Sequence, residues 1–272
     1  MSPQQREFAD NLPPASDFAA PAWTRKPAVF VPHPAPLAVA GCGFERVEQL
    51  LQAMPPEDII YRDAAGGTAA GMRRLGLPDW STTPLRRRLE TETNSLMLQN
   101  VQRYDRDFAV AVAQLFDWLA AELGVTASSF RNPTASIFLS SPHAISSYHT
   151  DREQNFLVHL HGVKTVHVFP RRLGLAQEIL VAMFRARKGI HFEYDSMLES
   201  TATEFVLQPG NTLYVPRNFP HWVDNGAEVS MSLSINFFRP MEFALERFYT
   251  MNDWLRDRCI RASRTLRRDG SR

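Results

Sequence analysis

The segment from Val229 to Phe237 constrains the fold of this chain most, because polar and apolar residues alternate over its whole length. Its polar positions are Ser230, Ser232, Ser234 and Asn236, and the positions between them are mainly aliphatic. Residues two apart on a strand point to the same face of a sheet. A long strand with one polar face indicates a barrel that lines a wet cavity.

Residues 135–238 contain about eight strand-like segments of this kind. Turn signals separate several of them, including Pro209-Gly210-Asn211 and the hairpin-type pair Asn225-Gly226. The segments lie at 136–140, 146–151, 155–161, 164–169, 203–207, 212–216, 221–224 and 229–237. Their number and spacing predict closure into a small antiparallel barrel or jelly roll.

Helical patterns flank this strand-rich region. Apolar residues at helical spacing predict helices at 44–54 and 105–123, and the same spacing recurs at 173–187 and from Met241 onward. Residues 1–40 are rich in proline and predict an extended arm with one short strand near 28–31, followed by a strand at 59–61 and an irregular segment at 64–90. The expected fold class is therefore mainly β with flanking helices. We expect three parts: an arm with helices at 1–134, a β core at 135–239 and a helical segment at 240–272.

Composition excludes several classes of protein. The 272 residues are 44% hydrophobic and 22% charged, with a formal net charge of +1, so no global charge bias favours nucleic acid or a membrane surface. No stretch approaches a membrane span, and Cys42 and Cys259 form no metal-spaced pair. These features predict a cytoplasmic protein. The Arg-rich end from Arg256 is interpreted as solvated, with a nucleic-acid-binding arm as the alternative. The apolar face from Met241 predicts a homodimer, with packing on the barrel as the alternative.

A candidate metal site is centred on His149 and Asp151. The two form His-x-Asp on a predicted strand, so their side chains can converge on one point. His221, after a proline-bounded turn, is the best third ligand. Two histidines and one carboxylate are the facial triad of non-haem Fe(II) oxygenases. A hydrogen-bonded structural His–Asp network is the alternative.

A second set of residues has the chemistry to hold a co-substrate. The chain has no flavin or nicotinamide fingerprint, so a keto acid that chelates the metal would supply the electrons. This co-substrate would be a dicarboxylate, and its carboxylate far from the metal needs a cation as partner. Lys164 is suited to that role, and Ser146 can add a hydrogen bond. Asn155 and Asn236 can orient the carboxylate at the metal. The alternatives are a surface lysine and asparagines in structural hydrogen bonds.

These residues also carry a resemblance to a known family. The runs 149–156, 162–164, 209–216 leading to His221, and 234–237 resemble the JmjC/cupin-like 2-oxoglutarate oxygenases, and most of all the asparaginyl hydroxylase subgroup of factor inhibiting HIF. The resemblance covers about residues 135–238 and implies a double-stranded β-helix. It implies His149, Asp151 and His221 as metal ligands. It also implies co-substrate binding by Lys164, Asn155, Asn236 and Ser146, the last in the place of a threonine.

The resemblance further implies an Fe(II)-dependent dioxygenase that uses O2 and converts 2-oxoglutarate to succinate and CO2. The expected reaction is hydroxylation of a protein or peptide side chain or of a small metabolite. An N-demethylase and a non-catalytic metal-binding cupin sensor remain as alternatives. No catalytic residue is expected beyond the metal and co-substrate ligands. The candidate pocket-lining residues are Tyr148, Leu157, His159, Phe138, Val223 and Phe238.

Overall fold

The computed structural model covers the whole chain. It describes residues 27–30, 42–64, 73–123, 125–170, 190–191, 194–245, 247–248 and 251–252. The predicted helix at 173–187, most of the N-terminal arm and the Arg-rich tail lie outside the described residues.

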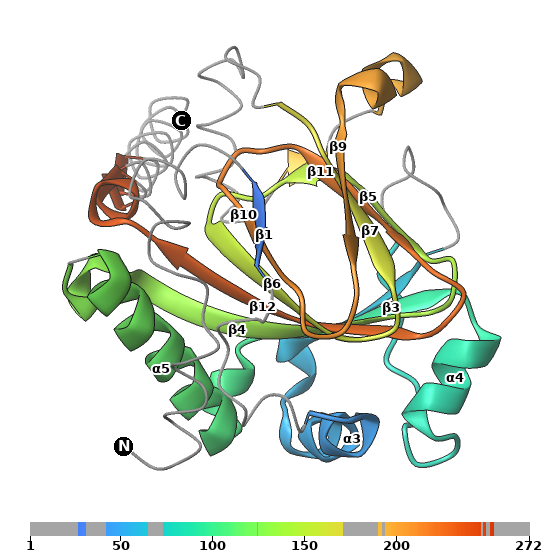
Figure 1. Cartoon of the computed structure of the whole chain (residues 1–272). Helices are drawn as coiled ribbons and strands as arrows, with labels where there is room; N and C mark the ends of the chain where they lie inside the picture. The colour runs from blue at the N-terminus through green and yellow to red at the C-terminus, as the bar shows by residue number, and fades with distance from the viewer. Residues whose placement is uncertain are drawn as a thin grey trace, which may run out of the picture.

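Two antiparallel sheets face each other and enclose a barrel (Figure 1). The larger, called the major sheet, has the order β1-β10-β6-β12-β4-β3-β2, and the minor sheet has the order β8-β5-β11-β7-β9. The strands of the major sheet are β1 (Ala28–Phe30), β2 (Ile59–Asp63), β3 (Asn94–Leu98), β4 (Arg131–Ser140), β6 (Gln154–His161), β10 (Thr212–Val215) and β12 (Ser230–Phe238). The strands of the minor sheet are β5 (Ile145–Thr150), β7 (Lys164–Val168), β8 (Ile190–His191), β9 (Thr203–Leu207) and β11 (His221–Asn225). The predicted fold class, mainly β with a jelly-roll core, is confirmed.

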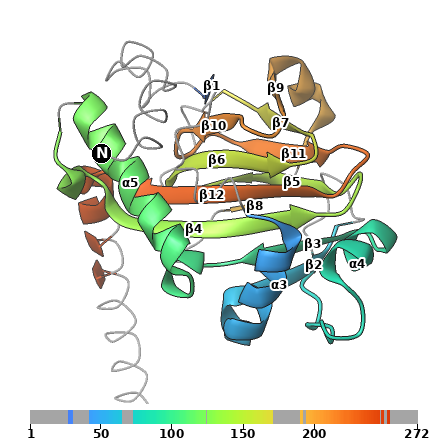
Figure 2. The same cartoon turned by 60° about the horizontal axis from the view of Figure 1, so that its bottom comes forward.

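Three helices cover the outer face of the major sheet (Figure 2): α3 (Phe44–Ala53), α4 (Leu85–Thr91) and α5 (Arg106–Leu123). The 3-10 turns are η2 (Pro56–Asp58), η3 (Val101–Arg103), η4 (Ala127–Ser129) and η5 (Ser196–Thr201), the last of which leads into β9 of the minor sheet. Apolar side chains from these helices, such as Leu50, Leu89 and Leu115, form one core with the outward residues of the sheet, such as Leu96 and Ile137. None of the helices in the described ranges has the length and apolar character needed to cross a membrane.

A second, smaller core lies inside the barrel, between the sheets. It contains Val166, Val168, Leu207, Leu213 and Val215. These residues belong to β7, β9 and β10 and are at most 4% exposed. They fill part of the interior with apolar side chains, whereas the inward positions of β4 and β12 are mostly polar. The barrel therefore has a dry part and a polar part.

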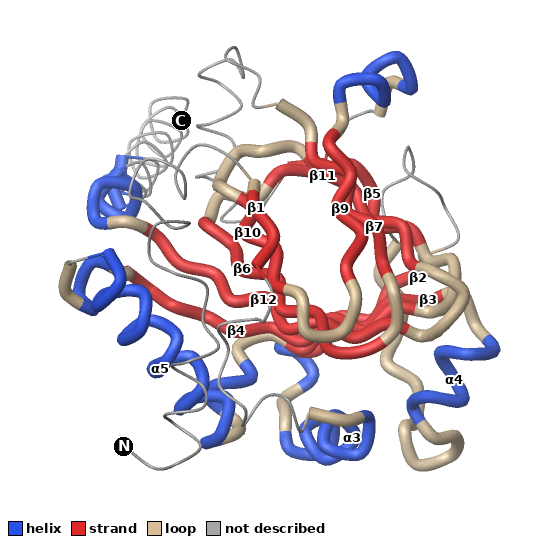
Figure 3. The backbone as a smooth tube through the Cα atoms, in the orientation of Figure 1, coloured by secondary structure: helices blue, strands red, loops and turns tan. Residues whose placement is uncertain are grey.

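Two elements were not predicted: a helix within residues 64–90, which were expected to be irregular, and a strand between residues 91 and 104, where none was expected. Helix α4 forms at Leu85–Thr91, and β3 extends the major sheet at Asn94–Leu98 (Figure 3). The helix buries only Leu85 and Leu89, and the strand is five residues long, so each pattern is too short to stand out in a sequence. Strands β2 and β3 thus carry residues of the expected N-terminal part into the barrel wall.

A bulge interrupts the alternation of β6. Strict alternation would place His159 and His161 on the same face, but the β6–β12 register shifts between Met231 and Ser232. His159 is buried beside Ser232, whereas the His161 ring makes an edge contact with Phe44 of α3. A β-bulge reverses which side a residue faces, and the sequence contains no clear signal for it.

Gly162 is required at the turn between β6 and β7. Its φ is +74°, and a Cβ there would lie 2.7 Å from the carbonyl oxygen of Val229. We expect Gly162→Ala to lower the free energy of unfolding by about 1–3 kcal/mol, because it combines a left-handed conformation with a clash against backbone. Urea denaturation followed by circular dichroism measures this change. Gly76→Ala, where a Cβ meets nothing within 4 Å, is the matched control and should change the stability little.

Candidate metal centre

The three predicted metal ligands meet at one end of the minor sheet. His149 on β5 lies directly opposite His221 on the neighbouring strand β11, and their ring centroids are 4.2 Å apart. Asp151 follows β5, and its carboxylate oxygens lie 4.0 Å from Nε2 of His149 and 3.7 Å from Nε2 of His221. Their ligand atoms all lie within 4.8 Å of one another.

Backbone carbonyls orient both imidazole rings. Nδ1 of His149 lies 2.7 Å from the carbonyl oxygen of Ser147, and Nδ1 of His221 lies 2.9 Å from that of Phe219. A carbonyl oxygen only accepts, so each Nδ1 carries the proton and donates it. The lone pair of each Nε2 therefore faces Asp151. Fixing the tautomer through the second ring nitrogen is the usual arrangement for a histidine that binds a metal.

A tight turn between β10 and β11 sets the position of His221. The backbone N–H of Asn218 donates to the carbonyl oxygen of Asp151 at 2.9 Å, so the turn is attached to the segment that carries the carboxylate. Asn218 has a φ of +64° and is buried. The turn and the strand pairing together bring residues 70 positions apart onto one site.

The donor set suits a first-row divalent metal. Ligand atoms about 2.0–2.2 Å from one ion are at most about 4.4 Å apart, so separations of 3.7 and 4.0 Å leave room for an ion and are too long for hydrogen bonds. Two imidazoles and one carboxylate on one side leave the remaining positions open. This set is typical of non-haem Fe(II) sites.

Lys164 lies inside the barrel on β7, where it shares a face with Val166 and Val168. It is 4% exposed, and burial lowers the pKa of its ammonium group to about 8. Among the described residues, no carboxylate forms an ion pair with it. A buried cation without a counter-ion is costly, so the site is suited to an anionic ligand.

The register of the minor sheet relates Lys164 to the triad. Asn225, Val223 and His221 on β11 pair with Lys164, Val166 and Val168 on β7. Lys164 is therefore four residues along the strand from His221, roughly 13 Å. Ser146 pairs with Val223, which lies on β11 between His221 and the partner of Lys164.

The two predicted asparagines lie opposite each other on β6 and β12. Nδ2 of Asn155 donates to Oγ of Ser234 at 2.8 Å, and Ser234 contacts Oδ1 of Asn236 at 3.4 Å. Oδ1 of Asn155 is buried without a hydrogen-bond partner among the described residues. An unsatisfied buried acceptor is uncommon in folded proteins, and a bound ligand or water would satisfy it.

A cavity of about 510 Å³ adjoins the triad. His149, Asp151, Ser146, Asn155 and Asn236 line it. It extends along the polar inward face of β4, where Thr134, Ser136 and Ser140 lie, and reaches solvent beside the exposed Asn132. The structure thus places a donor set for a metal beside a polar chamber.

Residues 113–245 match the JmjC domain family. The barrel is also similar to solved structures of YcfD from Escherichia coli. The first is 17% identical to this chain with a TM-score of 0.56, and the match covers 83% of this chain and 53% of the YcfD chain. A second, described as a ribosomal oxygenase in complex with cobalt and 2-oxoglutarate, is 19% identical with a TM-score of 0.55, covering 83% and 51%. A third holds cobalt and succinic acid, at 17% identity and a TM-score of 0.53, covering 83% and 51%.

The likeness to YcfD shows a shared fold, and this chain spans about half the length of those proteins. Comparison with curated protein sequences gives no match. All seven residues predicted to hold the metal and the co-substrate lie within the range that matches the JmjC domain. The assignment to the subgroup of factor inhibiting HIF stays a prediction from the sequence.

The six candidate pocket-lining residues are spread over different parts of the fold. Phe138 lines the cavity. Leu157 and Val223 instead pack into the apolar cluster inside the barrel. Tyr148 points the other way and makes edge contacts with Phe169 and Tyr194. Tyr148 is the neighbour of His149 on β5, and neighbouring residues of a strand point to opposite faces of the sheet.

His159 and Phe238 likewise do not belong to the lining of this cavity, and both make structural contacts. Nδ1 of His159 lies 2.9 Å from Oγ of Ser232, and Nε2 lies 2.9 Å from the carbonyl oxygen of Gly162. Burial, together with the charge of Lys164, lowers the pKa of His159 to about 3, so the ring is neutral. Phe238 is buried beneath the guanidinium of Arg152.

Part of the cavity wall was not expected from the sequence. Arg62, Ser95, Met97 and Arg103 line it, and all four precede the range that matches the JmjC domain. They come from β2, β3 and η3. The alternation over Asn94–Leu98 could have pointed to Ser95 and Met97, but it spans just five residues. Arg62 directly follows the strand predicted at 59–61.

A second group of potential ligands, His167, Glu199 and Glu204, lies on the outer face of the minor sheet. Nδ1 of His167 is 3.1 Å from Glu199 and 3.6 Å from Glu204, and the ring stacks on Trp222 at 3.7 Å. Because His167 alternates with the inward Val166 and Val168, this group faces away from the cavity.

The buried ammonium predicts a pH dependence of stability. Lys164 has a pKa of about 8 in the folded protein and 10.5 ordinarily, so the unfolded chain binds more protons between these values. The titration of Lys164 should therefore raise the free energy of unfolding by about 3 kcal/mol between pH 8 and pH 10.5. Lys164→Met should remove this rise. Urea denaturation of both proteins at a series of pH values measures it, and identical pH profiles would contradict it.

Proposed function

We propose that the chain is an Fe(II)- and 2-oxoglutarate-dependent oxygenase that hydroxylates its substrate and converts 2-oxoglutarate to succinate and CO2. The observation that carries this is the convergence of His149, Asp151 and His221 at one end of a polar cavity, with the unpaired Lys164 four residues further along the barrel. A metal site alone has no need for that buried cation. A dicarboxylate that binds metal at one end and lysine at the other does.

The residues of the chain divide the work of binding. The triad would hold Fe(II), with both histidines kept in the required tautomer by Ser147 and Phe219. Lys164 and Ser146 would bind the distal carboxylate of 2-oxoglutarate, and Asn155 and Asn236 would orient its other end. Fe(II) with 2-oxoglutarate supplies the chemistry of O2 activation. The apolar cluster of β7, β9 and β10 keeps water from that part of the barrel.

The direct test has two parts. Under anaerobic conditions, calorimetry with Mn(II)-loaded protein should show binding of one 2-oxoglutarate per chain. In air with Fe(II), the protein should form succinate from 2-oxoglutarate, and a true substrate should raise the rate. Normal metal content without 2-oxoglutarate binding would favour the non-catalytic cupin sensor and refute the oxygenase.

The outcome of the reaction is proposed to be hydroxylation rather than N-demethylation. Recognition of a methylammonium group usually relies on an aromatic cage. Among the described residues that line the cavity, Phe138 is the single aromatic one. A protein or peptide side chain is the proposed substrate, supported by the opening of the cavity beside exposed residues. Membership of the asparaginyl hydroxylase subgroup remains a proposal that rests on the spacing of the site residues.

We also propose that the protein is a cytoplasmic homodimer. The helical residues near the C-terminus leave Met241, Leu245, Phe248 and Met251 exposed by 45–74%. Burying these apolar side chains against a second copy is the natural way to remove them from water. Light scattering should give twice the chain mass, and Met241→Glu with Leu245→Glu should shift it toward one chain mass.

A further inference from the structure

The cavity wall outside the JmjC match carries positive charge. Arg62 on β2 and Arg103 on η3 both line the cavity that contains the metal ligands. The other charged lining residues are Asp151, Arg152 and Glu153. Asp151 faces the two histidines, and Arg152 pairs with Glu153 at 2.8 Å. Within the described part of the chain, no carboxylate pairs with Arg62 or Arg103.

Arg62 differs from the other partly buried arginines of the structure. Arg46 pairs with Asp105 and Asp107, and Arg88 pairs with Glu92. Arg62 is half-buried, and no carboxylate or other acceptor in the described part of the chain pairs with it. Burial lowers the pKa of Arg62, and the nearby guanidinium of Arg74 lowers it further. Arginine nevertheless stays protonated in proteins, so the cavity holds a fixed positive charge that lacks a counter-ion.

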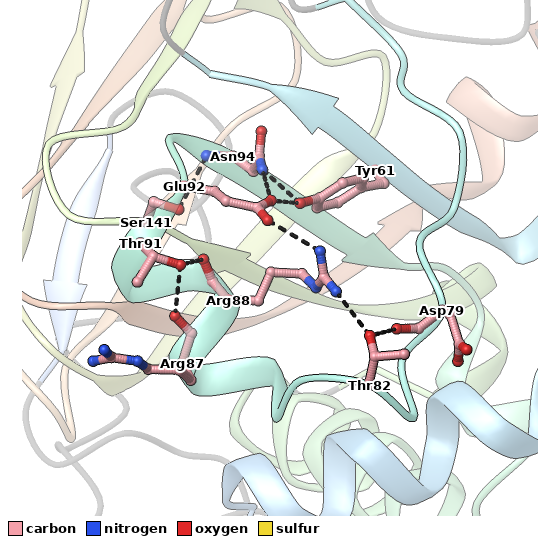
Figure 4. Close-up of polar contacts among 9 residues, drawn as sticks. All are labelled: Tyr61, Asp79, Thr82, Arg87, Arg88, Thr91, Glu92, Asn94 and Ser141. Carbon is pink, nitrogen blue, oxygen red and sulfur yellow. Dashed lines mark hydrogen bonds and ion pairs between the residues drawn. The ribbon is translucent and has the colours of Figure 1, made fainter.

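The acidic groups near β2 are turned away from Arg62. Tyr61, Glu92, Asn94 and Arg88 form a hydrogen-bonded network behind the strand (Figure 4). Neighbouring residues of a strand point to opposite faces, so this network holds β2 from outside and leaves Arg62 on the cavity side. Asp63, the next residue, pairs with Arg73 at 3.4 Å. The network thus fixes the arginine in place without neutralising it.

We propose that this cavity accepts a substrate with an anionic group, a carboxylate or a phosphate, which Arg62 binds with support from Arg103. The proposal rests on the proposed oxygenase function and adds the substrate class. Lys164 and Ser146 lie on the opposite, minor sheet and bind the co-substrate. A guanidinium presents two parallel donors to a carboxylate or phosphate, so it selects such a group over an amide or an ammonium.

The test uses full-length protein loaded with Mn(II) and 2-oxoglutarate without oxygen, so that substrate binds but does not react. Fluorescein-labelled hexapeptide pools with a fixed central glutamate, phosphoserine, glutamine or lysine are compared by fluorescence polarisation. Competition by N-acetylglutamate against N-acetylglutamine tests whether a small acid suffices. Calorimetry on the same samples records 2-oxoglutarate affinity.

We expect the acidic pools to bind about 10–100-fold more tightly than the glutamine pool, and the lysine pool to bind weakest. Arg62→Gln should remove most of this preference, and Arg103→Gln part of it, with 2-oxoglutarate affinity unchanged. Arg73→Gln, on an exposed arginine of the adjoining segment, is the matched control. Competition by N-acetylglutamate at similar affinity would identify a small acid as sufficient; its failure alongside acidic-peptide binding would identify a peptide.

Three results would overturn the proposal: equal binding of all pools, preference for lysine, or no binding of any acidic probe. A loss of 2-oxoglutarate affinity in Arg62→Gln would also overturn it, because the arginine would then serve the co-substrate. In each of these cases normal 2-oxoglutarate binding by the wild type leaves the oxygenase function standing. Failure of the wild type to bind 2-oxoglutarate refutes the oxygenase itself.

Discussion

Replacing Asp151 by asparagine is expected to reduce Fe(II) affinity by more than about 100-fold and to abolish formation of succinate. The amide is neutral and a poor ligand, and loss of even an outer partner of a metal ligand typically costs 10–100-fold in affinity. The carboxylate lies 3.7 and 4.0 Å from two histidine nitrogens that are turned toward it. Metal titration by calorimetry and a succinate assay measure both effects.

The control for this change is Glu204→Gln. It makes the same acid-to-amide exchange beside His167, on the outer face of the minor sheet. It should leave Fe(II) affinity and succinate formation within about twofold, because Glu204 is 61% exposed and faces away from the cavity. Thermal unfolding of both variants should stay close to the wild type. Fe(II) binding by Asp151→Asn at wild-type affinity would show that the triad is a structural network.

The second large effect is expected from Lys164→Met. Methionine has a similar length and no charge, so the variant keeps the packing beside Val166 and loses the buried ammonium. We expect 2-oxoglutarate to bind about 10–100-fold more weakly, which corresponds to a lost charge-assisted interaction of roughly 1.5–3 kcal/mol. Metal affinity should stay the same, because Lys164 lies four strand residues from His221.

Stability separates this expectation from simple damage to the fold. Removal of an uncompensated buried charge should raise the free energy of unfolding of the ligand-free protein at pH 7. Thr165→Val, on the same strand but facing the other way, should change neither ligand affinity nor metal affinity. A Lys164→Met protein that binds 2-oxoglutarate normally would show that the lysine is an ordinary wall residue.

The chemistry of the site could be predicted from sequence because it depends on local spacing. His149 and Asp151 are two residues apart on a strand, and that distance alone places both side chains on one face. The neighbours Ser146, Asn155 and Lys164 follow at short range. Only the roles of His221 and Asn236 depend on pairing between strands that are distant in sequence. The resemblance carried by the runs 209–221 and 234–237 predicted those two roles.

The residues beside the site were predicted less well, for two reasons. Tyr148 is the direct neighbour of His149 on β5, so ordinary alternation turns it to the other side of the minor sheet, where it contacts Phe169 and Tyr194. His161 instead lies beyond a bulge in the β6–β12 pairing and contacts Phe44 rather than the interior. A bulge of one residue reverses the face of the side chains beyond it but hardly alters the hydrophobic pattern of the sequence. Periodicity therefore cannot locate the bulge.

The sequence by itself determined the strand-rich core, the donor set of two histidines and one aspartate, and the lysine thirteen residues after that aspartate, because these depend on local geometry. Only the tertiary structure decided what surrounds them. Strands β2 and β3 join the major sheet through long-range pairing and bring Arg62 into the cavity, while the acids near Arg62 stay outside. Cavity charge is a sum over segments distant in sequence, and only folding brings those segments together.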